Sequence, residues 1–144
     1  MVKLLAMDPS PSLAAFKEFM TARVPYWQTI GLELKEVAPG SAVFEATVLP
    51  GLLQNKVLHG GVLASIADSA CAVAAISLVF PANYATTINL HVSYLRPVTQ
   101  GRFRAEGQCV KAGKSVMFSE ARVFDEKNIL VCAATSQLMV IRNE

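Results

Sequence analysis

The pattern of apolar and polar positions along the chain predicts two helices and six strands. Residues 12–23 repeat apolar side chains at helical spacing, and Ser12 is a suitable N-cap for them. Residues 62–80 form a second, longer helix that is apolar on nearly every face. The alternation typical of strands occurs in six further segments, at 30–35, 42–48, 88–94, 103–109, 115–124 and 129–141.

The order of these elements is helix, two strands, long helix, four strands. One apolar helix among six strands predicts an α+β fold, in which a curved antiparallel six-stranded sheet wraps around the long central helix. This is the hotdog arrangement, here with a short additional helix at the N-terminus. Short turns join the last four strands, so we expect those four to form an antiparallel meander. The chain shows no repeat or linker, which predicts a single domain over residues 1–144.

The helix at 62–80 is long enough to be confused with a membrane span. It is rich in Ala and Ser, however, and it carries Asp68 near its centre. An Asp at the middle of a bilayer costs about 2.5–3.5 kcal/mol on insertion scales. We therefore expect a buried central helix and no membrane partner.

Composition narrows the possible partners and location. The chain is 53% hydrophobic but only 17% charged, which suggests that part of its surface is buried between subunits. The net charge is only +2, and basic and acidic residues are interspersed along the chain, which argues against a nucleic-acid partner. The three cysteines form no CxxC pair, so we expect no metal site, no cofactor and a reducing, cytoplasmic location. Asp8 and Pro9 interrupt the N-terminal apolar run too early for a signal peptide.

His59, Gly60 and Gly61 stand at the start of the long helix, where glycine is a poor helix former. One explanation is a tight turn with close backbone packing. The other is functional, because a bare backbone lets a ligand oxygen reach the unpaired N–H groups of the first turn. Those donors suit an oxygen that becomes negative during a reaction.

Asp68 is the one carboxylate of this helix. It could simply bind a neighbouring backbone or hydroxyl group, such as that of Ser65 or Ser69, or it could be a base or nucleophile facing a cleft. Asp68 follows Gly61 by seven residues, which places both on one helix face about 10 Å apart. That separation is too large for both to act on one carbonyl. A symmetric dimer with antiparallel helices would bring Asp68 of one chain to Gly61 of the other.

Two segments carry a resemblance to a known family. LHGGVLASIADSA, residues 58–70, resembles the motif of the hotdog-fold acyl-CoA thioesterases of the phenylacetic-acid-degradation type, in which an acid follows the His by nine residues. NLHVSYLRPVTQGRFRAEG, residues 89–107, is similar to the two strands that come later in that family. The likeness covers residues 28–141.

The resemblance implies a role for each site residue. Asp68 would be the nucleophile or the general base that activates water, and the Gly61 N–H would hold the thioester oxygen, with Gly60 beside it. His59 would orient the loop and touch the carbonyl. Thr87 matches a family Ser or Thr that places the water or carboxylate, although strand alternation puts Thr86, not Thr87, on the apolar side with Ile88.

The chain departs from the family at one substrate contact. Many relatives carry Asn or Gln six residues before the His, where this chain has Leu53, so Gln54 or Asn55 would take that role. The activity implied is hydrolysis of an aryl or medium-chain acyl-CoA by a homodimer or homotetramer. The alternatives are a hotdog hydratase or dehydratase, and a hotdog module that binds acyl-CoA without catalysis.

Overall fold

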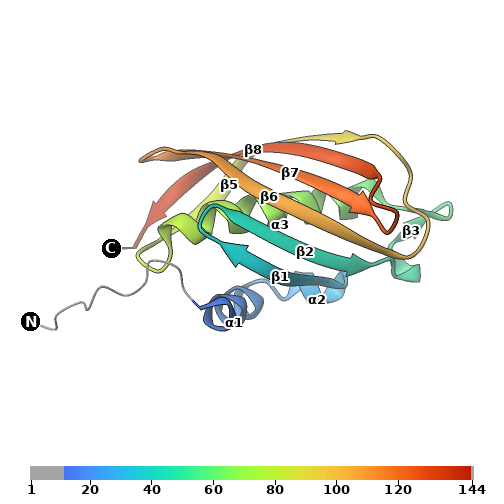
Figure 1. Cartoon of the computed structure of the whole chain (residues 1–144), viewed down its shortest axis with the longest axis horizontal. Coiled ribbons are helices and arrows are strands. Elements are labelled where there is room, and N and C mark those ends of the chain that lie inside the picture. Colours follow the sequence, from blue (N-terminus) through green and yellow to red (C-terminus); the bar gives the residue numbers. More distant parts are fainter. Residues whose placement is uncertain (1–11, 144) are drawn as a thin grey trace, which may run out of the picture.

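The long central helix lies inside a curved sheet, as the pattern predicts (Figure 1). The computed structural model describes residues 12–143, so the N-terminal run with Asp8 and Pro9 lies outside it. Helix α3 (Gly60–Val79) contacts all six strands of an antiparallel sheet. These strands are β1 (Leu32–Ala38), β2 (Ser41–Thr47), β5 (Asn83–Tyr94), β6 (Arg102–Ala112), β7 (Val116–Asp125) and β8 (Leu130–Arg142). The predicted α+β hotdog fold is confirmed.

The strand order corrects the expected meander of the last four strands. The sheet runs β1-β2-β6-β7-β8-β5, so β6, β7 and β8 are a meander but β5 pairs with β8 rather than with β6. The other edge of β6 is taken by β2, with Ala42 opposite Gly107. The connection from β5 to β6, residues 95–101, must therefore run past the ends of β8 and β7. This connection passes close to the start of α3.

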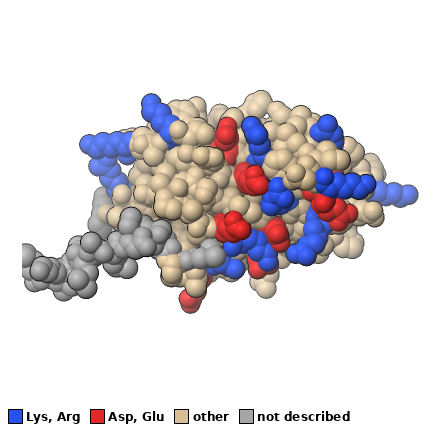
Figure 2. Space-filling view, viewed as in Figure 1, with Lys and Arg blue, Asp and Glu red and all other residues tan. Residues whose placement is uncertain are grey.

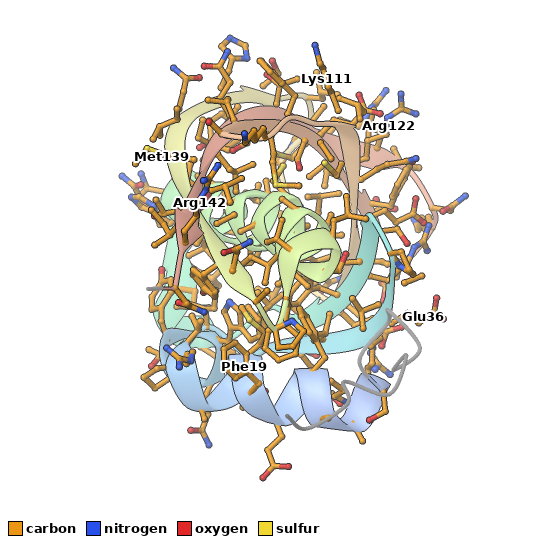
Figure 3. All side chains as sticks on the ribbon, turned by 90° about the vertical axis from the view of Figure 1, so that its left-hand side faces the viewer. Phe19, Glu36, Lys111, Arg122, Met139 and Arg142 are labelled. Carbon is orange, nitrogen blue, oxygen red and sulfur yellow. The ribbon has the colours of Figure 1, made fainter. Side chains whose placement is uncertain are left out.

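Burial explains why α3 is apolar on most of its faces. By length and a mean hydropathy of 2.0 it could cross a membrane, but 61% of that segment is buried inside the fold. Seen nearly end-on, the helix is surrounded by the sheet on most sides (Figure 3). Its apolar surface is thus used by the core of this domain.

Two short helices cover the side of α3 that the sheet leaves open. Helix α1 (Leu13–Arg23) begins as predicted, with the Ser12 hydroxyl accepting a hydrogen bond from the Ala15 N–H at 3.3 Å. Figure 3 shows α1 below α3, on the side away from the sheet. Helix α2 (Tyr26–Thr29) was not predicted. Its Trp27 is buried and donates from Nε1 to the Ser69 hydroxyl on α3 at 2.9 Å.

A small hairpin leads into α3. After a 3₁₀ turn (Pro50–Leu52), strand β3 (Leu53–Gln54) pairs with β4 (Val57–Leu58), and the two residues between them have positive φ, 51° and 65°. Two successive residues of this kind form the type I′ turn that suits a two-residue hairpin. The sequence pattern gave no indication of this hairpin, because its strands are only two residues long.

Charges of both signs are interspersed on the face formed by β1, β2 and β6 (Figure 2). Lys35 pairs with Glu33 at 2.9 Å, and Arg102 pairs with Glu45 at 3.2 Å. This agrees with the mixed charge pattern of the sequence and gives that face no strongly basic patch.

Candidate active site

The N-terminus of α3 is capped by His59. The backbone of this residue leaves the helix at φ −57° and ψ 134°, and its Nδ1 accepts a hydrogen bond from the Gly61 N–H at 2.8 Å. An Nδ1 atom that accepts cannot carry a proton, so in this arrangement the imidazole is the neutral form with its hydrogen on Nε2. His59 is exposed, which leaves the Nε2–H free to meet a ligand.

Close packing accounts for both glycines of the turn. A Cβ atom on Gly60 would lie 3.2 Å from Cζ of Tyr94, and one on Gly61 would lie 2.9 Å from Nδ1 of His59. The second distance is shorter than real Cβ atoms show. The structural explanation of the glycine pair is thus supported only in that Tyr94 or His59, both exposed side chains, would have to shift. The functional explanation is compatible with it, because neither glycine places a side chain of its own over the N–H groups.

The hydrogen bonds of the turn show which donors are available. The Gly61 N–H is bonded to His59, so a ligand oxygen must displace the imidazole to reach it. The Val62 N–H is bonded to the His59 carbonyl at 2.9 Å. The Gly60 N–H donates to no other residue in the part of the chain that the structure describes. Gly60 thus adds an open donor beside Gly61, at the positive end of the helix dipole.

A residue of the sheet, Thr87, forms a hydrogen bond with Asp68. The Thr87 hydroxyl on β5 donates to Asp68 Oδ1 at 2.7 Å, and Oδ2 accepts no hydrogen bond from another described residue. The hydroxyl group that binds Asp68 is thus that of Thr87, and not that of Ser65 or Ser69. Ser65 donates to the Gly61 carbonyl and Ser69 donates to the Ser65 carbonyl, each at 2.8 Å. Asp68 forms no ion pair with another described residue, so no cation within residues 12–143 neutralises it.

A β-bulge decides that Thr87, and not Thr86, faces the helix. The pairing of β5 with β8 shifts by one residue between Thr87 and Asn89, so Ile88 is the extra residue. Ile88 is 53% exposed and Thr86 is also exposed. The expectation from simple alternation is therefore wrong at this point, because a bulge reverses the facing of the residues before it relative to those after it.

Gln54 and Asn55 lie on the hairpin that precedes His59. Gln54 is the last residue of β3, and Asn55 is the first residue of the turn, with φ 51°. Both are exposed, and apart from the backbone pairing of Gln54 with Val57, neither side chain forms a hydrogen bond with another residue within 12–143. Asn tolerates positive φ better than most residues, so Asn55 has a structural reason to be there. Their proposed substrate contact has no further support within one chain.

Cys71 lies one turn beyond Asp68 but has no catalytic character. It is fully buried, and burial, with a smaller contribution from the Asp68 charge, raises its pKa to about 12. A thiol of this kind stays protonated near neutral pH. Among the described residues no group of three or more His, Cys, Asp or Glu side chains could hold a metal ion.

Two tyrosines that contact the turn and α3 through their hydroxyl groups were not identified from the sequence. Tyr94 Oη donates to the Gly60 carbonyl at 2.8 Å, and Tyr26 Oη lies 3.0 Å from the Ser65 hydroxyl. Neither contact could be read from periodicity, because each joins residues 34 or more positions apart. The one available signal was the presence of Tyr94 in the second motif.

The hotdog fold, with one carboxylate on its central helix and a His-Gly-Gly turn at the start of that helix, can be compared with known protein families. The family model described as the thioesterase superfamily matches residues 55–132, more than half of the chain. The chain belongs to this superfamily, and it is a thioester hydrolase of the hotdog fold.

Known relatives agree with this assignment. The chain is 27% identical over 139 residues to the medium/long-chain acyl-CoA thioesterase YigI of Salmonella typhimurium, covering 85% of this chain and 90% of that protein. It is 27% identical over 114 residues to 1,4-dihydroxy-2-naphthoyl-CoA hydrolase of Listeria monocytogenes, covering 78% and 93%. Among solved structures, a thioesterase family protein from Silicibacter pomeroyi is similar, with a TM-score of 0.83, 26% identity, and coverage of 90% and 98%.

Proposed function

We propose that this protein hydrolyses acyl-CoA thioesters, with Asp68 as the catalytic carboxylate. The observation that carries the proposal is the unneutralised Asp68, fixed by Thr87 at 2.7 Å on the central helix of a thioesterase fold. Asp68 is half-buried, and a structural acid partly withdrawn from water would be expected to have a cation or several donors around it. Asp68 has one donor, which orients it and leaves the second oxygen for the reaction.

In the reaction, an oxygen nucleophile adds to the thioester carbonyl and the C–S bond then breaks. If Asp68 acts as a general base, it takes a proton from water, and the acid and the CoA thiol are released directly. If Asp68 attacks, it forms a mixed anhydride that water then hydrolyses to the same products. In both routes the carbonyl oxygen becomes negative, and N–H groups at the start of α3 stabilise it.

The other site residues take supporting roles in this proposal. Gly60 and Gly61 supply the backbone donors, and His59, once displaced from Gly61, can place its Nε2–H near the same oxygen. Thr87 holds Asp68. Gln54 or Asn55 would contact the thioester from the exposed hairpin.

We propose that the acyl group is aryl or medium-chain, as in thioesterases of the phenylacetic-acid-degradation type. The two relatives support both possibilities. The Salmonella enzyme is named for medium- and long-chain acyl-CoA, and the Listeria enzyme for an aromatic acyl-CoA.

The site is complete only in a dimer, in our proposal. Gly61 and Asp68 are about 10 Å apart along one helix, at 1.5 Å per residue. Strand β5 is an edge of the sheet and is twelve residues long, and a long open edge favours pairing with another chain. A hollow of about 320 Å³ on this chain is lined by Glu106, Gln108 and Arg122 among others, and by none of the predicted site residues. Antiparallel α3 helices would join Asp68 to the partner's turn, and two such dimers would form the expected tetramer in the cytoplasm.

The first experiment is an assay of the purified protein with a panel of acyl-CoAs and detection of the released thiol. Release of CoA from aryl or medium-chain substrates is expected. Water addition to enoyl-CoA without thiol release would instead indicate a hydratase, and tight binding without turnover would indicate a binding module.

The matched variant is Asp68→Asn. The amide is nearly isosteric with the carboxylate, and its oxygen can still accept a hydrogen bond from the Thr87 hydroxyl. The fold and assembly should therefore be kept. Turnover should fall by roughly a hundredfold or more, as expected for loss of a base or nucleophile. An Asp68→Asn protein with the wild-type rate would refute the catalytic role.

A further inference from the structure

The segment that follows β5 is bonded directly to the turn at the start of α3. Tyr94 Oη donates to the Gly60 carbonyl at 2.8 Å. Four residues later, the Val98 carbonyl accepts from the Leu58 N–H at 2.7 Å, immediately before His59. The two motifs that resemble the thioesterase family, 58–70 and 89–107, are therefore in contact with each other.

This segment is itself anchored to the sheet. The Val131 carbonyl on β8 accepts from the N–H groups of Leu95 and Arg96 at 2.9 and 3.2 Å. The Arg96 side chain donates to the Leu130 carbonyl at 2.6 Å, and Val98 is buried. The backbone next to Tyr94 is therefore held by hydrogen bonds to β8. The Tyr94 hydroxyl links this part of the sheet to the turn before α3.

The geometry of the peptide bond makes the Tyr94 contact important for the proposed oxyanion donor. The Gly60 carbonyl and the Gly61 N–H belong to one planar peptide unit, in which they point in opposite directions. A hydroxyl group that holds the carbonyl therefore also sets the direction of the N–H. A hydrogen bond accepted by the carbonyl further polarises the N–H and makes it a stronger donor.

The close approach of the Tyr94 ring explains why residue 60 is glycine. A Cβ atom there would lie 3.2 Å from Tyr94 Cζ and 3.4 Å from the hydroxyl oxygen. Any larger side chain would push the phenol away from the carbonyl. A side chain at position 60 would therefore disturb the contact between Tyr94 and the Gly60 carbonyl.

We propose that Tyr94 is a positioning residue for catalysis. It does not touch the thioester; it holds the Gly60–Gly61 peptide so that the Gly61 N–H meets the oxygen as it becomes negative. This inference rests on the proposed thioesterase function and assigns a role to a residue of the second motif.

The chain offers a matched control for the Tyr94→Phe substitution. Tyr26 Oη is within 3.0 Å of the Ser65 hydroxyl, which donates to the Gly61 carbonyl. That carbonyl belongs to the next peptide unit, whose Val62 N–H is bonded to the His59 carbonyl inside the helix. Tyr26→Phe therefore removes one exposed hydroxyl from the same region without changing the peptide that supplies the proposed donor.

The experiment compares both variants with the wild type in two measurements. In Tyr94→Phe, kcat should fall roughly threefold to tenfold, the effect of one hydrogen bond. Its affinity for a thioether analogue of the substrate, an S-alkyl-CoA without a carbonyl oxygen, should be unchanged by calorimetry. Tyr26→Phe should alter neither value by more than about twofold, as expected for an exposed site. A Tyr94→Phe enzyme with unchanged kcat, or with equal losses in turnover and thioether affinity, would overturn the positioning role.

Amide hydrogen exchange separates this inference from the thioesterase proposal. If the wild type hydrolyses no acyl-CoA in the panel, the proposed function fails but the Tyr94 contact is still testable. The Gly61 N–H should then exchange faster in Tyr94→Phe than in Tyr26→Phe or the wild type. Equal exchange in all three proteins would overturn the inference whatever the activity.

Discussion

The contact between Thr87 and Asp68 is the smallest unit on which the proposed chemistry depends. A single donor at 2.7 Å sets the rotamer of the carboxylate, and Thr87 is itself fixed by the pairing of β5 with β8. Orientation of this kind affects rate, because a reacting group out of line by a small amount loses much of its effect.

We therefore predict different results from two substitutions of Thr87. Thr87→Val keeps the shape but removes the hydroxyl, and kcat/KM should fall by about tenfold or more through loss of orientation. Thr87→Ser keeps the hydroxyl and should retain most of the activity. Steady-state kinetics with the best acyl-CoA of the panel would test this. Equal rates for Thr87→Val and the wild type would show that the contact has no catalytic role.

Cys71 leads to a prediction for alkaline pH. Burial raises its pKa from 9.0 to about 12, so between these values the unfolded chain loses a proton that the folded chain keeps. The free energy of unfolding should therefore be unaffected by this thiol below about pH 9 and should fall above it, by about 1.4 kcal/mol per pH unit.

Comparison of the wild type with Cys71→Ala in urea unfolding at several alkaline pH values isolates this effect. The variant loses some core packing at all pH values, but its stability should decline less steeply above about pH 9. Cys132, whose pKa burial raises to about 11, contributes in the same direction to both proteins. Parallel pH curves for the two proteins would contradict the prediction.

At the level of elements, the contact between α3 and β6 depends on one glycine. A Cβ atom on Gly107 would lie 2.1 Å from the carbonyl oxygen of Ala70, and backbone cannot move aside as a flexible side chain can. Gly107 thus allows the central helix to lie close against the sheet, in the part of α3 next to Asp68.

We predict that Gly107→Ala destabilises the protein by about 3 kcal/mol or more, because it forces the helix and the strand apart. Gly51→Ala is the matched control, since a Cβ atom there meets nothing within 4 Å. Its effect should stay within about 0.5 kcal/mol. Urea unfolding measures both. A Gly107→Ala protein as stable as Gly51→Ala would mean that the packing of α3 on β6 can relax at little cost.

At the level of the whole molecule, we propose that the site is shared between two chains. This follows from the separation of Gly61 and Asp68 on one helix, and it can be tested by mixing two inactive variants. The first is Asp68→Asn. The second is Gly61→Val, whose side chain would displace the His59 imidazole that lies 2.9 Å from a Cβ atom at this position.

In a mixed dimer, one site would carry both substitutions and the other would carry neither. Random exchange of subunits should therefore restore about a quarter of the wild-type activity per chain, as expected for a symmetric dimer with two shared sites. Mass spectrometry under native conditions would verify that mixed dimers form. Verified mixed dimers without recovered activity would place the whole site within one chain.

Much of the fold and of the proposed site could be predicted from sequence because the signals are local. Helix and strand periods depend on residues within a few positions of each other, so α1, α3 and the six strands of the sheet were predictable. The spacing of His59, Gly61 and Asp68 also follows from the rise of one helix. These features needed no knowledge of what packs against what.

The tertiary structure decided what depends on pairing between distant segments. The order of β5 and β8, the bulge at Ile88 and the facing of Thr87 are set by register, which the alternation within one strand does not contain. The Tyr94–Gly60 contact joins residues 34 positions apart across the connection between sheet and helix. Composition and periodicity could therefore predict that an acid and a glycine turn lie on one helix, but only the folded chain shows which side chains hold them in place.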